Sequence, residues 1–480
     1  MSLYDILASL DKNGPSLTTV DNSYTAGDLR NVVTRYELLF HPYTLEGKRV
    51  ALLVPNIKEF LPLLITINKL KGTISPLSLQ SRQDDLLAVL DFLDPHIVVT
   101  VNEYSGFNFS EVVTNWAKDR KSETTIFSTD NYINWSIHTF HGSSKKLQNE
   151  LGGFICFTSG STGNPKGVVI KDTVIDYGYE RLIEAMELKP DDNVFVYASI
   201  SGVYGIIAMK TILRLGATLV VSDDFNLVEM INAMKKANCN KLTTTPSIFK
   251  TLYNFASRIE PEVLKSLELV SVIGEKIPAN FKSHFPLLEN CKFLSNYGSS
   301  ESGPLANAII KEDNNELEFT MSDAVNFKIV DGELLVKTGG LFSEYYNNAT
   351  QTEEVFENGW FKMGDLVEFS DDKTFKLVGR KKEVIKKGGQ QVIPSEVEQI
   401  LSNIEGIETV AVVGAPHEVY GEQVIAFIIA KGVNSKDIRS YCTGRIASFK
   451  IPDKIVFVDE FPLKNGKVDK LKLKSQLGRG

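Results

Sequence analysis

The first three hundred residues alternate short β-rich runs with segments of helical length, and this alternation constrains the fold more than any other feature. Apolar runs rich in Val, Ile, Leu and Thr predict strands, and the amphipathic stretches between them predict helices. The predicted strands cover residues 49–55, 96–101, 193–198, 217–222, 241–245, 267–273 and 291–294. The predicted helices include residues 58–70, 84–93, 205–215 and 227–237. Strands that alternate with helices predict parallel sheets built of βαβ units.

The pattern changes twice after residue 310. Two short strands at 326–330 and 333–337, joined by Asp331-Gly332, predict a small antiparallel region. After Arg380 a mixed pattern returns, with a helix that starts at Pro394-Ser395 and has Glu398 in the position of a capping box. Strands at 409–413, 424–431 and 454–458 and a helix at 436–448 complete this part.

We therefore expect an α/β protein with two domains. A large N-terminal domain, residues 1–380, contains the parallel βαβ sheets and the small antiparallel β region. A small α+β C-terminal domain, residues 381–480, follows it directly. The junction has no Pro-, Gly- or Ser-rich linker, which favours a hinge and a mobile C-terminal domain.

Composition excludes several classes of protein. No run approaches the roughly 20 apolar residues of a membrane span, and the start does not resemble a secretory signal. The four cysteines are far apart and form no CxxC, which excludes a zinc ribbon and a dithiol redox motif and argues against a disulfide framework. A reduced, cytoplasmic setting fits this cysteine usage.

Charge is unevenly distributed. Residues 380–480 contain 17 Lys and Arg against 12 Asp and Glu, a balance of +5, while the whole chain has a net charge of −8. An acidic body argues against a general nucleic-acid binder. The basic end is either an ordinary solvated surface or a surface for phosphates or an acidic partner.

Phe157–Gly167 has the composition of a phosphate-binding segment. It places four hydroxyl side chains, three glycines and Lys166 directly after an apolar run. Glycines let backbone N–H groups approach oxyanions, and lysine neutralises them. The segment is not a Walker A loop, because Pro165 precedes the lysine and Gly167 follows it.

Three further stretches are weak signals when taken singly. Asn296–Gly303 offers an aromatic ring, hydroxyls and a carboxylate after a predicted strand. Gly359–Asp365 ends on an aspartate of the kind that binds ribose hydroxyls. Pro462–Lys470 places a lysine after an Asn-Gly turn near the end of the chain. Taken singly, each is better explained as an ordinary surface turn or a solvated charge.

Together, these stretches resemble, in their order and amino-acid sequence, the motifs of the adenylate-forming superfamily. This superfamily includes acyl- and aryl-CoA synthetases, nonribosomal peptide synthetase adenylation domains and luciferases. The resemblance covers nearly the whole chain. It includes residues 47–55, 71–78, 332–338, 359–365, 379–398 and 462–470.

The resemblance implies a ligase that activates a carboxylate with ATP and Mg²⁺ and passes the acyl group to a thiol. Residues implied to bind the β- and γ-phosphates are Thr158, Ser159, Gly160, Ser161, Thr162, Gly163 and Lys166. Residues implied to hold adenine are Gly274, Glu275, Lys276, Asn296, Tyr297 and Gly298, with Tyr297 stacked on the base. Residues implied elsewhere in the nucleotide site are Ser300 near the α-phosphate, Glu301 on magnesium, and Asp365 and Arg380 on the ribose hydroxyls.

The resemblance also assigns roles to the end of the chain. Lys467 bridges the attacking carboxylate and the α-phosphate, and Lys382 is the hinge. The loop implied to cover the adenylate in the second step contains Lys386, Gly388, Gly389 and Gln391. Gly389 either leaves room for a thin phosphopantetheine arm or supplies a turn with positive φ.

One departure concerns the acid pocket, which the resemblance places at Ser201, Gly202, Tyr204, Pro304 and Leu305. CoA ligases usually have a histidine where this chain has Gly202. The chain also lacks the Phe-Asp pattern of amino-acid activators, so no carboxylate is expected to meet a substrate ammonium. A plain acyl or aryl acid is therefore favoured over an α-amino acid.

Three functions remain open. An acyl- or aryl-CoA ligase is favoured, with a small carboxylic acid, ATP and CoA as substrates. The alternative is a stand-alone enzyme that loads the phosphopantetheine arm of an acidic carrier protein, which the basic C-terminal part would attract. The third, a non-enzymatic nucleotide-binding regulator, is disfavoured by the presence of both Glu301 and Lys467.

Overall fold

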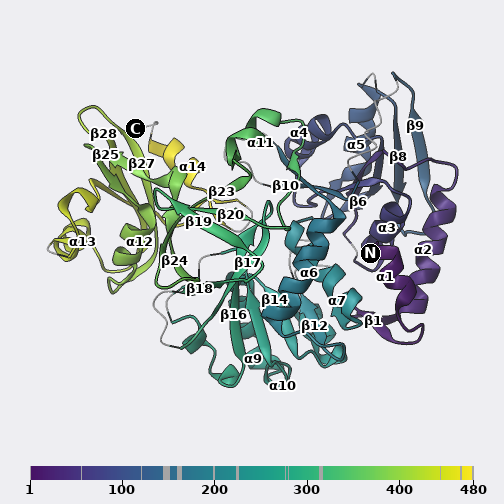
Figure 1. Ribbon diagram of the computed structural model, residues 1–480, viewed down its shortest axis with the longest axis horizontal. Coiled ribbons are helices and arrows are strands. Elements are labelled where there is room, and N and C mark those ends of the chain that lie inside the picture. Colours follow the sequence, from purple (N-terminus) through teal and green to yellow (C-terminus); the bar gives the residue numbers. More distant parts are fainter. Residues whose placement is uncertain are drawn as a thin grey trace. The chain divides into compact units, whose positions relative to one another are not determined.

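The computed structural model describes residues 2–55, 57–120, 122–143, 152–158, 165–197, 201–222, 226–275, 277–278, 280–312, 317–443, 445–464 and 467–477. It forms two compact units (Figure 1). The N-terminal unit comprises residues 1–325 and 338–354, and the C-terminal unit comprises residues 326–337 and 355–480. The contacts of the antiparallel region therefore place it in the same unit as the end of the chain. The domain boundary at residue 380 stays a prediction.

An eight-stranded sheet forms one part of the N-terminal unit, in the order β21-β11-β10-β4-β3-β5-β8-β9. Its strands are β3 (Arg49–Leu53), β4 (Thr73–Pro76), β5 (Ile97–Val101), β8 (Thr124–Thr129), β9 (Ser136–Phe140), β10 (Phe154–Thr158), β11 (Lys166–Ile170) and β21 (Glu344–Tyr345). The central pairs are parallel, as predicted, and β9, β11 and β21 add antiparallel edges.

A second sheet of the N-terminal unit runs β18-β17-β16-β15-β14-β12-β13-β1-β2. Its strands are β1 (Pro15–Thr18), β2 (Ser23–Thr25), β12 (Asn193–Val196), β13 (Thr218–Val220), β14 (Lys241–Thr244), β15 (Leu269–Val272), β16 (Lys292–Ser299), β17 (Gly303–Ile309) and β18 (Glu318–Met321). The strands from β16 through β1 pair in parallel, which confirms the βαβ prediction.

Helices connect and cover these sheets (Figure 1). They are α1 (Leu3–Ser9), α2 (Ala26–Phe40), α3 (Ile57–Lys69), α4 (Gln83–Leu93), α5 (Phe109–Lys118), α6 (Asp172–Met186), α7 (Val203–Leu215), α8 (Leu227–Ala237), α9 (Pro246–Ile259), α10 (Glu262–Lys265) and α11 (Ala349–Val355). Local sequence explains their ends. Thr25 and Asp28 form a capping box at the start of α2, and Gly216, with φ of 83°, ends α7.

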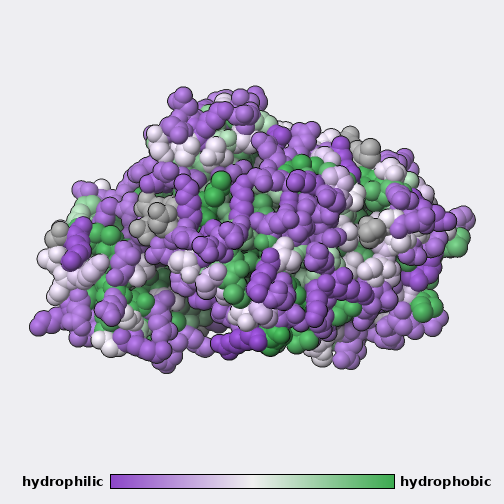
Figure 2. All heavy atoms as spheres, turned by 90° about the horizontal axis from the view of Figure 1, so that it is seen from below, coloured by the Kyte–Doolittle hydropathy of each residue, from purple (hydrophilic) through white to green (hydrophobic). Residues whose placement is uncertain are grey.

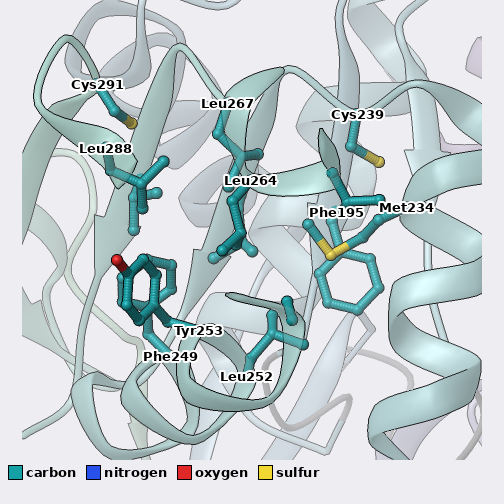
Figure 3. Close-up of a cluster of buried hydrophobic side chains, with 14 of the residues drawn as sticks. Phe195, Met234, Cys239, Phe249, Leu252, Tyr253, Leu264, Leu267, Leu288 and Cys291 are labelled. Atoms are coloured by element: carbon teal, nitrogen blue, oxygen red, sulfur yellow. The ribbon is translucent and has the colours of Figure 1, made fainter. Parts of the chain in front are cut away.

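The second sheet has two chemically different faces. Phe195, Leu242, Val270 and Phe293 point to one face and pack with side chains of α8, α9 and α10 in an apolar cluster, part of which Figure 3 shows. Side chains alternate along a strand, so Thr243 and Ser271 lie on the opposite face. This face carries polar groups into the candidate site.

The strands of the C-terminal unit form two small sheets and the two-stranded hairpin β30–β31. One sheet runs β19-β20-β23-β24, and the other runs β26-β25-β28-β27 with β29 on β28. Its strands are β19 (Asn326–Val330), β20 (Glu333–Lys337), β22 (Phe356–Glu357), β23 (Trp360–Phe369), β24 (Thr374–Arg380), β25 (Ile385–Lys387), β26 (Gln390–Val392), β27 (Ile407–His417), β28 (Gly421–Ala430), β29 (Lys454–Phe457), β30 (Leu463–Lys464) and β31 (Lys467–Val468). Its helices are α12 (Pro394–Ser402), α13 (Ser435–Cys442) and α14 (Lys470–Gln476).

Two predictions about the C-terminal unit are wrong. The capping box at α12 does not form, because the Ser395 hydroxyl donates to the Val378 carbonyl and Glu398 accepts from the Val412 N–H. The N-cap is Ile393, which has no side-chain acceptor. The helix predicted over 436–448 ends at Cys442, where Thr443 has an extended backbone.

Apolar side chains gather inside both units, whereas the face in Figure 2 is mainly hydrophilic with scattered hydrophobic residues. All four cysteines are unpaired and buried, in agreement with the expected lack of disulfides. Within the described ranges, no helix has the length and hydropathy that a bilayer crossing requires.

Candidate active site

The carboxyl ends of β14, β15 and β16 form a polar edge in the N-terminal unit. Asn296, in the second half of β16, donates from Nδ2 to the hydroxyl of Ser271 on β15, at 2.9 Å. The Tyr204 hydroxyl, from the start of α7, lies 2.9 Å from the hydroxyl of Thr243 on β14. Ligands of open α/β sheets bind outside the carboxyl ends of the strands. The edge is therefore a suitable position for a ligand site.

Asn296, Tyr297 and Gly298 lie together at this edge, as consecutive residues of β16. Tyr297 is 7% exposed and packs against Phe319 with ring centroids 5.7 Å apart. Position 298 requires glycine because the backbone of β17 lies so close that an added Cβ would be 2.1 Å from the carbonyl oxygen of Gly303. The register shift between Tyr297 and Gly298 marks the bulge that brings the two strands so close.

The turn between β16 and β17 carries Ser300 and Glu301. Ser299 and Ser302 brace it, since the Ser299 N–H donates to the Ser302 hydroxyl at 3.0 Å and the Glu301 N–H donates to the Ser299 hydroxyl at 3.2 Å. The Glu301 carbonyl accepts from the Phe342 N–H at 2.7 Å. The backbone of Glu301 is thus fixed on both sides.

The Glu301 side chain meets Lys166 and Tyr345 in an ionic cluster. Lys166 Nζ lies 3.0 Å from Glu301 Oε1, and the Tyr345 hydroxyl donates to the same oxygen at 2.9 Å. The Lys166 ammonium also lies 3.9 Å from the centroid of the Tyr345 ring. The predicted site residues Lys166 and Glu301 are therefore in contact. Tyr345, which the sequence did not indicate, contacts both of them.

This environment keeps Glu301 ionised. Burial alone would raise its pKa, but the Lys166 ammonium and the hydrogen bonds from Lys166 and Tyr345 outweigh burial, so the pKa lies below its ordinary value. Burial and the neighbouring carboxylate raise the pKa of Tyr345, which remains a neutral donor. The cluster thus presents one carboxylate and one ammonium at neutral pH.

Gly274 and Glu275 follow β15 at the same edge. Gly274 has φ of 81°, a left-handed conformation that favours glycine. The Glu275 carboxylate accepts from the Ser247 N–H and hydroxyl at 3.1 and 2.7 Å, so it fixes this loop to the first turn of α9. Ser247 is a second supporting residue that the sequence did not indicate.

The predicted acid-pocket residues come from two places in the N-terminal unit. Gly202 is the N-cap of α7, and its φ of −99° is open to any residue, so the backbone does not require glycine there. Tyr204 is half-buried, and burial raises the pKa of its hydroxyl. Pro304 and Leu305 are buried in β17, and Ser201 precedes α7.

Asp365 and Arg380 meet in the C-terminal unit. They pair across β23 and β24, and Arg380 Nε lies 2.8 Å from Asp365 Oδ1. Asp365 is 4% exposed, whereas half of the Arg380 side chain is exposed. The buried carboxylate of Asp365 is thus paired with the guanidinium of Arg380, which reaches the protein surface.

The remaining predicted residues of the C-terminal unit lie on exposed segments. Lys382 belongs to the short helix η3 (Lys381–Glu383), and Lys386 pairs with Gln391 across the β25–β26 hairpin. The turn of this hairpin contains Gly388 and Gly389, which have φ of 56° and 80°. The turn has positive φ at both positions, a conformation that glycine adopts without steric cost. Lys467 pairs with Lys464 on the β30–β31 hairpin and is exposed.

Some predicted residues cannot be placed. Those outside the described residues are Ser159, Gly160, Ser161, Thr162, Gly163 and Lys276. Thr158 is described only as the last residue of β10. The phosphate-binding role of this segment stays a prediction.

Two family models match the chain. The model described as AMP-binding enzyme matches residues 39–346, and the model of the AMP-binding enzyme C-terminal domain matches residues 396–467. The first covers more than half of the sequence. The chain belongs to the AMP-binding enzyme family. The family models and the CoA-ligase relatives together support an AMP-forming acid–thiol ligase, and a non-enzymatic regulator is no longer supported.

Two relatives illustrate a similarity that extends over most of both chains. The chain is 24% identical to the long-chain-fatty-acid–CoA ligase FadD13 of Mycobacterium tuberculosis, with 90% of this chain and 88% of that protein covered. It is 24% identical to the oxalate–CoA ligase of Arabidopsis thaliana, with 87% and 85% covered. The acids named in these relatives differ greatly.

The fold agrees with solved structures of the same architecture. ATP-bound MatB from Rhodopseudomonas palustris superposes with a TM-score of 0.84 at 20% identity, covering 99% of this AMP-binding enzyme and 98% of that chain. This likeness confirms the predicted α/β class with parallel sheets, an antiparallel region and a C-terminal α+β part.

Proposed function

We propose that this enzyme uses ATP to convert a small acyl or aryl acid into an acyl-adenylate and then transfers the acyl group to CoA. The ionic cluster of Lys166, Glu301 and Tyr345 carries the proposal, because it holds one cation and one anion in fixed geometry beside the polar edge. Charge on transferring phosphates requires groups of this kind. The relatives supply the precedent for a CoA ligase.

In the first step, a carboxylate oxygen of the acid attacks the α-phosphorus of ATP, and pyrophosphate leaves. Lys166 and the segment from Thr158 to Gly163 bind the leaving phosphates. Asn296, Tyr297, Gly298 and the 274–276 loop hold adenine, and Ser300 contacts the α-phosphate. Asp365 and Arg380 hold the ribose, and Lys467 neutralises the charge between the two reacting groups.

The side chain of Glu301 is suitable for Mg²⁺. It is ionised, 14% exposed and fixed through Oε1, and both of its hydrogen-bond donors bind that one oxygen. Across the residues that the structure describes, no group of three His, Cys, Asp or Glu side chains could form a complete metal cage. Mg²⁺ commonly takes one or two protein carboxylates together with substrate phosphates. Bound there, it would neutralise charge on the phosphates.

In the second step, the thiol sulfur attacks the acyl carbon and AMP leaves. We assign the hinge to Lys382 and the loop near the adenylate to Lys386, Gly388, Gly389 and Gln391. Rotation about the hinge would withdraw Lys467 and present that loop. None of the residues proposed for the acid pocket is charged; they are Ser201, Gly202, Tyr204, Pro304 and Leu305. This supports a plain acyl or aryl acid over an amino acid.

A carrier protein is the second candidate for the thiol partner. The +5 balance of residues 380–480 favours it, because an acidic carrier would be attracted to a basic surface. We also propose a cytoplasmic location, which the four unpaired, buried cysteines support.

A pyrophosphate-exchange screen tests the proposal. The enzyme, ATP and Mg²⁺ are incubated with octanoate, benzoate, dicarboxylates and amino acids, and acid-dependent exchange is measured. Active acids are then supplied with CoA or with a holo-carrier protein, and the thioester is detected. Exchange with amino acids alone, or no exchange with any acid, would contradict the proposal.

A further inference from the structure

Lys470 is a mostly buried cation for which the proposed reaction has no direct use. Its side chain is 26% exposed, and Nζ lies 2.9 Å from Glu383 Oε2 and 2.9 Å from Glu398 Oε1. Burial opposes the charged form, but attraction by the two carboxylates outweighs burial and raises the pKa of Lys470. The side chain is therefore a permanent cation at neutral pH.

The two carboxylates belong to different segments of the C-terminal unit. Glu383 is the last residue of η3 and follows Lys382, the proposed hinge. Glu398 lies in α12, and its Oε1 also accepts from the Val412 N–H of β27 at 2.8 Å. The ammonium of Lys470 thus joins the hinge segment to the helix and sheet of the unit.

Only two residues separate Lys470 from Lys467, and this connection is stiff. The Asp469 N–H donates to the Pro462 carbonyl at 2.7 Å, which closes the hairpin that carries Lys467. The Asp469 carboxylate accepts from the Lys472 N–H at 3.0 Å and caps α14. The hairpin and the helix therefore have a common fixed point beside Lys470.

An apolar contact holds the other side of α14. Leu473 is fully buried among Ala411, Val413 and Phe427 of the C-terminal sheet. This contact fixes the helix against the sheet but does not reach the hinge segment. The ion pairs of Lys470 make that second connection.

We propose that Lys470 is a positioning residue, which ties the Lys467 hairpin to the Lys382 segment so that the two move as one body between the half-reactions. The inference rests on the proposed function, which gives Lys467 and Lys382 their roles. Without this tie, the hairpin would keep its fold but lose its orientation relative to the hinge.

Lys470→Met tests the inference, and Lys472→Met is the matched control because Lys472 is exposed on the same helix. We expect pyrophosphate exchange in Lys470→Met to fall about 10- to 100-fold in kcat, since a small misplacement of a catalytic group has effects of this size. The KM for ATP should stay close to wild type. Thioester formation from supplied acyl-adenylate should also survive, because Lys467 is not needed there.

Lys470→Arg should restore exchange, as an arginine can reach the same carboxylates. Equal losses in both half-reactions, normal exchange in Lys470→Met, or the same loss in Lys472→Met would overturn the inference. If Lys470→Met does not fold, the triple variant with Glu383→Gln and Glu398→Gln removes the unpaired buried charges. Wild-type exchange by a folded triple variant would also refute the tie.

The result separates this inference from the proposed function. Normal exchange in Lys467→Ala would remove the proposed role of Lys467 and, with it, the basis of the inference. Impaired pyrophosphate exchange in Lys467→Ala together with normal exchange in Lys470→Met would refute only the positioning role of Lys470.

Discussion

The two units hold their charged groups in opposite ways. In the N-terminal unit, Lys166 and Glu301 contact each other and Tyr345 directly, so the proposed catalytic charges are themselves part of the packed structure. In the C-terminal unit, Lys467 and Lys386 are exposed on hairpins, and the partly buried ion pairs of Lys470 follow the Lys467 hairpin in the chain. The difference indicates that the N-terminal unit fixes its charged side chains before a ligand binds. The C-terminal unit instead presents Lys467 and Lys386 on exposed hairpins of a rigid scaffold.

Lys467→Ala gives the largest expected effect and tests the C-terminal side of this comparison. Removing one cation from a phosphoryl-transfer transition state costs about 10²–10³ in rate. We expect that loss in pyrophosphate exchange, whereas thioester formation from supplied acyl-adenylate is largely retained. Because Lys467 is exposed, the melting temperature should not change. A comparable loss in both half-reactions would contradict the assignment.

Gly389→Leu tests whether the exposed β25–β26 turn serves the second half-reaction. Gly389 has φ of 80° and Gly432 has φ of 71°, and an added Cβ at either position would meet nothing within 4 Å. Gly432→Leu is therefore a matched control, because a side chain at either position costs about 1–2 kcal/mol of backbone strain. Only Gly389→Leu should slow thioester formation, by about 10- to 100-fold.

Pyrophosphate exchange should stay close to wild type in both glycine variants. If Gly389→Leu impairs both half-reactions equally, the glycine serves only the backbone of the turn. If Gly432→Leu impairs thioester formation to the same extent, strain rather than a blocked path explains the loss.

Tyr345→Phe tests the N-terminal side of the comparison. The variant removes the hydroxyl that donates to Glu301 but keeps the ring beside Lys166. Loss of one hydrogen bond to a charged group should raise the Mg²⁺ concentration needed for half-maximal exchange by about tenfold. Tyr346→Phe is the control, since its hydroxyl donates to the Leu93 carbonyl at 3.1 Å. An unchanged Mg²⁺ requirement in Tyr345→Phe would show that Glu301 needs no such support.

The sequence predicts most strands and helices of the N-terminal unit because these depend on local patterns. The βαβ alternation gives the parallel sheets, and Lys166 and Glu301 are found from their motifs. Tyr345 is not found, because its position depends on the pairing of β21 with β11, which no local pattern encodes. The capping box fails for a related reason: Glu398 bonds to Val412 and Lys470, which lie far away in the sequence.

The smallest expected effect concerns the pH dependence of the Glu301 cluster. The pKa of Glu301 is lowered in the folded protein, so its ionised form stabilises the fold above the ordinary pKa of a glutamate. This contribution is lost as pH falls through the lowered pKa, because protonation removes the ion pair with Lys166. Glu301→Gln lacks the charge at every pH, and at neutral pH it should be less stable than wild type by about 1–3 kcal/mol. Urea unfolding of both proteins between about pH 7 and pH 3 should therefore show the difference shrinking with acidification. A constant or growing difference would mean that the charge of Glu301 does not stabilise the folded N-terminal unit, and that the cluster is not organised in advance of ATP.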